Sequence, residues 1–232
     1  EMRLDHRNWI RVKPLTEHNL RIRLNKDGQF AEPPLTRYGI LQTGHGNGTY
    51  ALKREKHSLT IQTEEADLEL DTRDGQFKLL TSGSRGQMNK HFKPEILEQS
   101  AGLFINLADD EKLYGLGDGM RGKLQKRGYK EEMEVREGPP YLPIPYLMSH
   151  LGWGLVLVTT YRHSFDLGCT DQEQIQISIS NPKELDFIVF TGTSYGELLD
   201  RYTEVAGKPA LLPMWGYGLS TSIRSKNLNA RE

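Results

Sequence analysis

The chain has 232 residues, of which 36% are hydrophobic and 26% charged, and its formal net charge at pH 7 is −1. This length suits one large domain with a sizeable core, or two small ones. The near-neutral charge gives no overall attraction to nucleic acid or to an acidic membrane surface, so neither is expected as a partner.

The chain has one cysteine, Cys169, which excludes an intrachain disulfide and a cysteine-based zinc site. The histidines are scattered without metal-ligand spacing, so neither a metal nor another cofactor is expected. Cys169 follows the apolar stretch 165–168, and we expect a small buried core residue rather than a reactive thiol. No run reaches the roughly 20 apolar residues of a membrane helix, and residues 1–9 lack a signal-peptide core. The expected location is therefore the cytoplasm.

Alternation of apolar and polar residues with a period of two dominates the chain, which is typical of strands with one buried face. Arg21–Leu24 alternates and runs into Lys26–Gly28, a hairpin signal, whereas Gly154–Val158 is fully apolar and suits a strand covered on both faces. The pattern predicts strands at 21–24, 58–62, 66–70, 76–79, 103–107, 154–158, 174–180 and 185–190. Many short strands with Gly, Asp and Pro turns predict an all-β fold, an antiparallel β-sandwich.

One helix is expected near the end of the chain. Ser194 and Glu197 form a Ser-x-x-Glu capping box, apolar residues follow at helical spacing to Ala206, and Gly207 and Pro209 supply the stop. After the helix comes a short connector, Ala210–Trp215, and residues 220–232 then turn polar and complete no further element. We therefore expect a sandwich domain over 1–207 and, over 208–232, a linker and the beginning of a second domain.

The glycine-rich stretch Tyr114–Gly119 does not predict a nucleotide site. A dinucleotide fingerprint needs a following helix in a βαβ unit, and the residues that follow have no apolar helical face. No Ser-His-Asp, Cys-His or metal constellation can be placed by spacing either. No catalytic residue is therefore assigned to this chain.

The charged segment 121–137 reads most simply as a solvated loop or an exposed hairpin. Its functional interpretation is a loop that projects from the sandwich and walls a pocket for a polyhydroxylated ligand, which needs charged groups and an aromatic face. The candidate substrate-binding residues on this interpretation are Glu134, Arg136, Glu137 and Tyr141.

An ordered series of motifs over residues 103–219 resembles family 31 of the glycoside hydrolases. The segment Glu111–Asp118 resembles the family's "E-x-x-Y/F-G-L-G-E", with Asp118 in place of the usual Glu. Further matches, in order, are Lys126–Gly128, Tyr141–Ser149, Gly152–Val156, Ser164–Gly168, Leu185–Gly192, Arg201–Ala210 and Pro213–Trp215 with Gly218.

The resemblance implies a galactose-mutarotase-like β-sandwich packed against a (β/α)8 barrel. Members are retaining α-glycosidases in which one Asp attacks the anomeric carbon and another acts as acid and then base. Both belong to the barrel, so this chain is expected to support and partly wall that active site and to be inactive alone. The expected partners are its own barrel and an α-linked oligosaccharide or glycoside. As a detached piece it is expected to expose an apolar patch and to self-associate.

The loop of this sequence departs from the family pattern. Members commonly carry "W-N-x-D" where this chain has Glu132–Val135, which leaves Glu134, Arg136 and Glu137 as substitutes for the usual contact. Segment 218–222 is similar to the α-xylosidase branch, but α-glucosidase ranks slightly ahead. Two further alternatives stay open. One is a stand-alone mutarotase-type enzyme using His150 or His163 as acid with a Glu base, and the other a non-catalytic carbohydrate-binding module.

Overall fold

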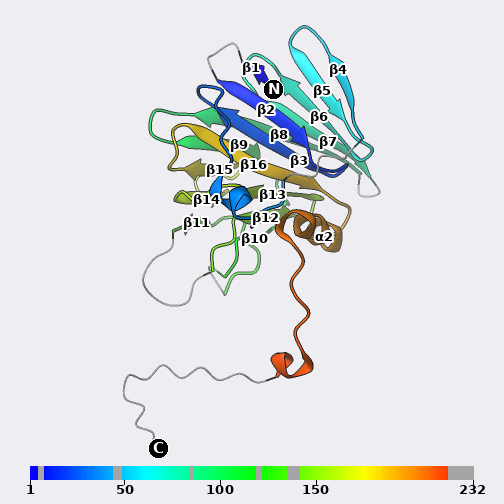
Figure 1. The fold of residues 1–232 in the computed structure, drawn as a ribbon, viewed down its shortest axis with the longest axis vertical. Coiled ribbons are helices and arrows are strands. Elements are labelled where there is room, and N and C mark those ends of the chain that lie inside the picture. Colours follow the sequence, from blue (N-terminus) through cyan, green and yellow to red (C-terminus); the bar gives the residue numbers. More distant parts are fainter. Residues whose placement is uncertain (5–7, 44–48, 84–85, 119–121, 135–141, 219–232) are drawn as a thin grey trace, which may run out of the picture.

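The computed structural model describes residues 1–4, 8–43, 49–83, 86–118, 122–134 and 142–218. Two antiparallel sheets face each other in it, with α2 on the outer face of one of them (Figure 1). One sheet has the strand order β1-β2-β3-β16-β13-β12-β10, and the other β11-β14-β15-β9-β8-β7-β6-β5-β4. This arrangement confirms the predicted antiparallel β-sandwich.

The elements have the following bounds. The strands are β1 (Met2–Arg3), β2 (Trp9–Pro14), β3 (Asn19–Asn25), β4 (Ala51–Arg54), β5 (Ser58–Gln62), β6 (Ala66–Asp71), β7 (Phe77–Gly83), β8 (Gly86–Ile96), β9 (Ala101–Asn106), β10 (Leu113–Gly115), β11 (Lys130–Met133), β12 (Tyr146–Ser149), β13 (Trp153–Leu157), β14 (His163–Leu167), β15 (Gln174–Ile179) and β16 (Glu184–Thr191). The helices are α1 (Pro34–Arg37), α2 (Tyr195–Ala206) and the 3₁₀-helix η1 (Met214–Tyr217).

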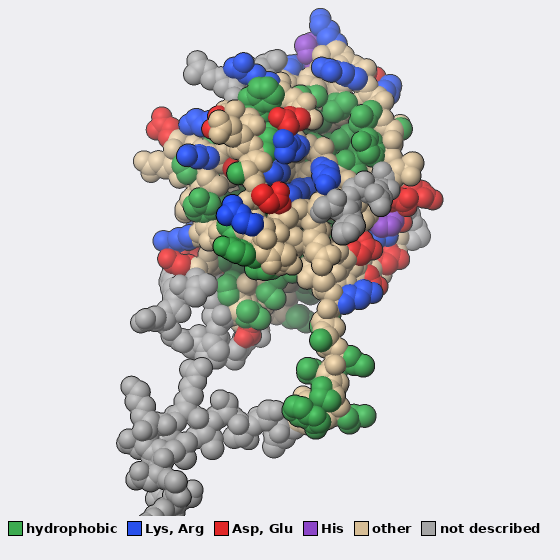
Figure 2. Space-filling model, viewed as in Figure 1, with side chains coloured by type: hydrophobic (Ala, Val, Ile, Leu, Met, Phe, Trp, Pro, Cys, Tyr) green, Lys and Arg blue, Asp and Glu red, His purple; other side chains and the backbone are tan. Residues whose placement is uncertain are grey.

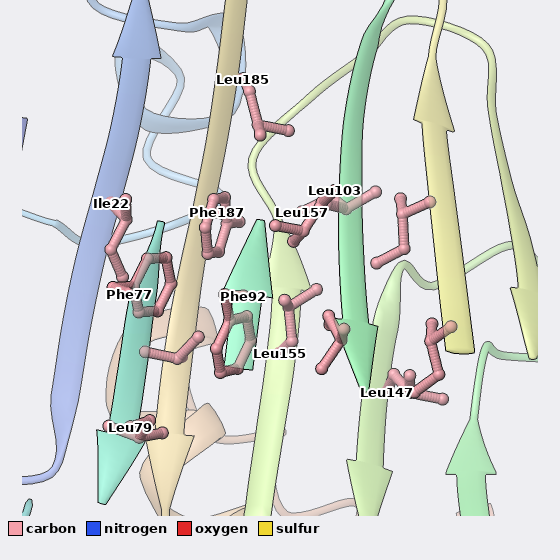
Figure 3. Packing of buried hydrophobic residues seen from close by; sticks show 14 of the residues in the cluster. Ile22, Phe77, Leu79, Phe92, Leu103, Leu147, Leu155, Leu157, Leu185 and Phe187 are labelled. Atoms are coloured by element: carbon pink, nitrogen blue, oxygen red, sulfur yellow. The ribbon is translucent and has the colours of Figure 1, made fainter. Parts of the chain in front are cut away.

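The main core lies between the two sheets and is built from the inward residues of both. Leu155 and Phe187 of one sheet point toward Phe77 and Phe92 of the other (Figure 3). The rings of Phe77 and Phe92 stack at 4.6 Å between centroids, an arrangement that adds to the stability gained from burial alone. The alternating positions of the predicted strands therefore supply the core, as the period of two requires.

A second apolar cluster covers the outer face of the seven-stranded sheet, where α2 packs on β16 and β13. Because this cluster covers one face of β13 and the main core covers the other, β13 is buried at every position. The fully apolar sequence of this strand predicts that burial. The buried members of this cluster are Leu15, Leu41, Tyr146, Val156, Val158, Ile188, Phe190, Leu198 and Val205.

Strand β3 differs from the prediction in two ways. All seven of its residues are buried, because the segment between β3 and β4 lies over its polar face and makes Arg21 and Arg23 as inaccessible as the core leucines. The turn at 26–28 also leads into α1 rather than back into a paired strand, since the neighbours of β3 are β2 and β16. The hairpin prediction was therefore wrong, whereas the hairpin between β6 and β7 at 72–76 is present.

Helix α2 begins and ends as predicted. The Ser194 hydroxyl accepts the N–H of Glu197 at 3.2 Å, and the chain leaves the helix at Gly207 with φ +81°. The Glu197 carboxylate accepts the N–H of Thr193 at 2.7 Å. A capping box would instead use the N–H of Ser194, the next residue. Among the described residues, no helix is long and apolar enough to cross a membrane.

Cys169 is exposed, which corrects the expectation of a buried core residue. It lies in a turn after β14 that a carboxylate rather than apolar packing holds in place. Asp166 Oδ1 accepts the N–H groups of Cys169 at 2.9 Å and Thr170 at 3.2 Å. Burial acts to raise the pKa of Asp166, but these bonds and the Thr170 hydroxyl outweigh it, so the pKa lies below its ordinary value.

Candidate functional site

The candidate loop leaves the sandwich at the end of β11. Of the four predicted substrate-binding residues the structure describes Glu134, while Arg136, Glu137 and Tyr141 lie outside the described residues. Glu134 is half-buried and its Oε2 lies 3.7 Å from Nε of Arg162. Arg162 also donates to Glu132 at 2.6 Å, and these carboxylates raise the pKa of its guanidinium. Arg162, the residue before β14, thus links the base of the loop to that strand.

Nothing along the chain singles out Arg162, because its role depends on strand pairing. Strand β11 pairs with β14 in a register that places Met133 opposite His163. The residues flanking that pair, Glu134 and Arg162, are therefore brought together across the end of the two strands. The contact between Glu134 and Arg162 cannot be predicted from residue spacing, since the two residues are far apart in sequence.

The glycine-rich stretch lies against the segment that returns from the loop. Gly115 and Gly117 have φ values of +114° and +72°. A Cβ atom at Gly117 would lie 2.1 Å from the carbonyl oxygen of Leu142, and one at Gly115 would lie 2.2 Å from that of Tyr146. The N–H of Asp118 donates to Leu142 at 2.9 Å. These glycines are required for close backbone approach, which explains the motif without a phosphate.

Glu111, the first residue of the same motif, is fully buried. Its Oε1 accepts the Ser149 hydroxyl at 2.6 Å and the Trp153 indole N–H at 2.7 Å. Its Oε2 accepts the ammonium of Lys90 and the N–H of Ala108 at 3.1 Å. Burial lowers the pKa of Lys90, although Glu111 opposes that shift. The carboxylate therefore ties β8, β12 and β13 together and takes a structural role rather than a catalytic one.

The motif at 126–128 fixes the chain between β10 and β11. The Arg127 guanidinium donates to the carbonyl oxygens of Ala108 and Gln172, the latter at 3.1 Å. Gly128 has φ +84° and its N–H donates to Leu167 at 2.7 Å. The segment that leads into β11 is thus held by hydrogen bonds to the carbonyl oxygens of Ala108, Gln172 and Leu167.

The two histidines proposed for a mutarotase-type site are engaged by their own neighbours. His150 Nδ1 accepts the N–H of Lys112 at 3.0 Å. His163 is buried, with Nδ1 2.8 Å from the carbonyl oxygen of Tyr161 and Nε2 3.2 Å from Sδ of Met133. Burial lowers the pKa of His163. Across the described part of the chain, no group of three or more His, Cys, Asp or Glu residues could hold a metal ion.

The segment after α2 carries large apolar side chains into solvent. It runs away from the sandwich, and its hydrophobic residues stand clear of the two sheets (Figures 1 and 2). Leu211 is 91% exposed, Met214 89% and Trp215 82%. Because a soluble domain rarely leaves such residues contiguous and uncovered, this segment is an apolar surface suited to another protein layer.

Curated relatives of this chain include α-xylosidases that are much longer. The chain is 32% identical to an α-xylosidase of Emericella nidulans over 120 residues, which are 50% of this chain and 15% of that protein. It is 30% identical to the α-xylosidase XylQ of Lactiplantibacillus pentosus over 50% of this chain and 16% of the relative. The alignments thus span less than a fifth of these two relatives.

The fold matches solved structures of the same kind. A GH31 dextranase of Flavobacterium johnsoniae complexed with isomaltotriose aligns with a TM-score of 0.78 and 22% identity over 91% of this chain and 27% of that one. The family model "Glycosyl hydrolase 31 N-terminal galactose mutarotase-like domain" matches residues 10–166. The chain therefore belongs to the N-terminal galactose mutarotase-like domain family of glycosyl hydrolase 31.

Proposed function

We propose that this chain is the N-terminal β-sandwich of a retaining α-glycosidase and that it supports and partly walls an active site on a catalytic barrel. The observation that carries the proposal is the uncovered apolar segment at 211–217, which follows α2 directly. A barrel packed on that segment would bury it. On this proposal the sandwich extends to residue 207, and residues 208–232 are the linker and the beginning of the barrel.

The proposed contribution to the active site comes from the loop after β11. Glu134, Arg136, Glu137 and Tyr141 would contact the glycoside, since carboxylates and guanidinium groups form bidentate hydrogen bonds to vicinal hydroxyls and a tyrosine ring offers an apolar face. Arg162 would hold Glu134 in place. By the family resemblance, the nucleophile and the acid–base residue would belong to the barrel. A retaining mechanism needs these two carboxyl groups about 5 Å apart across the scissile bond.

The proposed substrate is an α-xyloside, with an α-glucoside second. The sequence motifs alone put the glucoside slightly ahead. The curated relatives shift that balance, because the α-xylosidases align over 120 residues at 32% and 30% identity, whereas an α-glucosidase of Saccharolobus solfataricus aligns over 89 residues at 29%. Both sugars present the same hydroxyl pattern except at C5, so the loop alone does not separate them.

The test measures hydrolysis of nitrophenyl α-xyloside and α-glucoside, first by this chain and then by a protein in which a barrel follows it. The chain alone is expected to be inactive, and the longer protein active. In the longer protein, Glu134→Gln is expected to raise KM more than it lowers kcat, whereas Glu98→Gln, at an exposed turn, should change neither.

Turnover by the isolated chain would overturn the proposal. Acceleration of sugar anomer interconversion that is lost in His163→Gln would support a mutarotase instead. Micromolar binding of xylo- or malto-oligosaccharides to the isolated chain, measured by calorimetry, would support a carbohydrate-binding module, because an incomplete pocket is expected to bind only weakly.

A further inference from the structure

A cavity on the outer face of the seven-stranded sheet is lined mainly by basic residues. Its volume is about 210 Å³, and four of its seven lining residues are basic while one is acidic. Lys and Arg side chains gather over β2 and β3 on this face (Figure 2). The lining residues are Arg11, Lys13, Arg21, Arg23, Glu32, Thr36 and Thr43.

The sheet places these cations directly opposite one another. In the antiparallel pair of β2 and β3, Arg11 faces Arg23 and Lys13 faces Arg21. Like charges in such cross-strand pairs are destabilising, and here two of the four side chains are also buried, with Arg21 6% exposed and Arg23 3%. This arrangement therefore needs anions nearby.

Neighbouring carboxylates form ion pairs with three of the four cations, and among the described residues Lys13 alone of the four has none. Asp186 accepts Arg21 Nε at 3.0 Å and Nη2 at 2.6 Å, and Glu184 accepts Arg23 Nε at 2.6 Å. Arg11 donates from Nε and Nη2 to Glu1 at 3.0 and 2.6 Å. The buried arginines are thus held rigidly from the side of β16, which presents the lining to the cavity in a fixed geometry.

The hydrogen-bonding capacity that is left at the cavity consists largely of donors. Lys13 Nζ makes one bond, to the carbonyl oxygen of Thr43 at 3.0 Å, and so keeps two protons. Within the described residues Nη1 of Arg11, whose guanidinium lies over the Phe30 ring, has no hydrogen-bond partner, and the buried Thr36 hydroxyl has none either. Glu32 is exposed, and its carboxylate forms no ion pair with any described residue. Ammonium, guanidinium and hydroxyl donors around one small space suit an oxyanion.

We propose that this cavity is a binding site for a small oxyanion, namely a phosphate or sulfate group, either free or carried on a sugar. Its volume fits such a group and is below the range of typical drug-sized ligand pockets. The ligand bonds with Lys13, Arg11 and Thr36, beside the ion-paired Arg21 and Arg23. The site is independent of the proposed glycosidase function, because it rests on β2, β3 and the segment before β4.

The experiment is calorimetric titration of the chain with inorganic phosphate at constant ionic strength. Saturable binding is expected. Lys13→Gln should weaken it by about tenfold, the loss of one charge-assisted hydrogen bond. Glu32→Gln should tighten it, because this change removes the one carboxylate that lines the cavity. Lys53→Gln is the matched control, since Lys53 lies on β4 of the other sheet with 69% of its side chain exposed.

Parallel titrations with glucose 6-phosphate and with glucose distinguish the two sources of the group. Tighter binding of the sugar phosphate than of phosphate, with none of glucose, identifies a phosphorylated sugar, and equal binding identifies the free anion. The proposal is overturned by the absence of saturable phosphate binding. It is equally overturned by binding that Lys13→Gln and Lys53→Gln change alike, or by weaker binding in Glu32→Gln.

Discussion

Glu111 ties three strands together through one carboxylate, so its charge can be tested separately from its shape. Glu111→Gln keeps the volume but leaves the Lys90 ammonium buried without its counter-ion. We expect a loss of about 3–5 kcal/mol in the free energy of unfolding, as for other broken buried pairs. Urea denaturation measures it, and Glu98→Gln, at an exposed position, should stay within about 0.5 kcal/mol of the parent.

A double-mutant cycle separates charge loss from general damage. Adding Lys90→Met to Glu111→Gln removes the orphaned cation, so the double variant should be more stable than the sum of the two single changes predicts. Strict additivity would mean that Lys90 and Glu111 do not interact. The position of Glu111 in a motif was visible in the sequence, but its burial was not, because an isolated Glu is usually exposed.

The buried imidazole of His163 gives the stability a pH dependence. Burial lowers the pKa of His163 below its ordinary 6.5, with the Tyr161 carbonyl oxygen opposing. Between the two pKa values the unfolded chain binds more protons than the folded chain, so stability falls as the pH drops through 6.5. Urea midpoints at about pH 7.5 and 5.5 should differ more in the parent than in His163→Gln. An equal drop in both proteins would assign the effect to other groups.

At the scale of elements, the strands that the sequence reveals are those whose inward positions are all apolar. β15 and β16 were predicted nearly to their ends because apolar residues occupy the positions that face the core. These are Ile175, Ile177 and Ile179 in β15 and Leu185, Phe187 and Val189 in β16. β8 also alternates between buried and exposed residues, yet two of its buried positions are Lys90 and Pro94. The pattern breaks there because a buried ion pair replaces an apolar contact, and that pair exists only in the folded chain.

A substitution at Gly117 tests whether the glycine-rich stretch packs closely against the segment around Leu142 that follows the loop. Gly117 and Gly39 have nearly equal φ values, +72° and +70°, but only at Gly117 would an added Cβ meet backbone, whereas at Gly39 nothing lies within 4 Å. Gly39→Ala should therefore cost about 1 kcal/mol, the penalty for the backbone conformation alone. Gly117→Ala should cost about 1–3 kcal/mol more, because the Leu142 carbonyl must move. Equal losses in urea denaturation would contradict the close approach.

At the scale of the whole molecule, the two halves of the chain differ in what their sequence reveals. Motifs identify the family over residues 103–219, while the family model matches 10–166. In the first hundred residues only alternation stands out to inspection, which any sandwich shares, although the family model also matches them from residue 10. In the loop after β11, the sequence suggests a function but does not reveal the contacts. Its residue types suggest sugar contact, but the Arg162–Glu134 contact depends on the pairing of β11 with β14 and is invisible along the chain.

The exposed apolar segment after α2 leads to a prediction about association. Leu211, Met214 and Trp215 are each more than 80% exposed, and contiguous apolar surface of this kind favours contact with another copy when no other layer covers it. Sedimentation velocity should show association that rises with concentration, and replacing these three residues with Ser should abolish it. Leu124→Ser is the matched control, because Leu124 is 81% exposed on a different segment. A monomer at every concentration, or equal association in the triple variant, would show that the segment does not act as a docking surface.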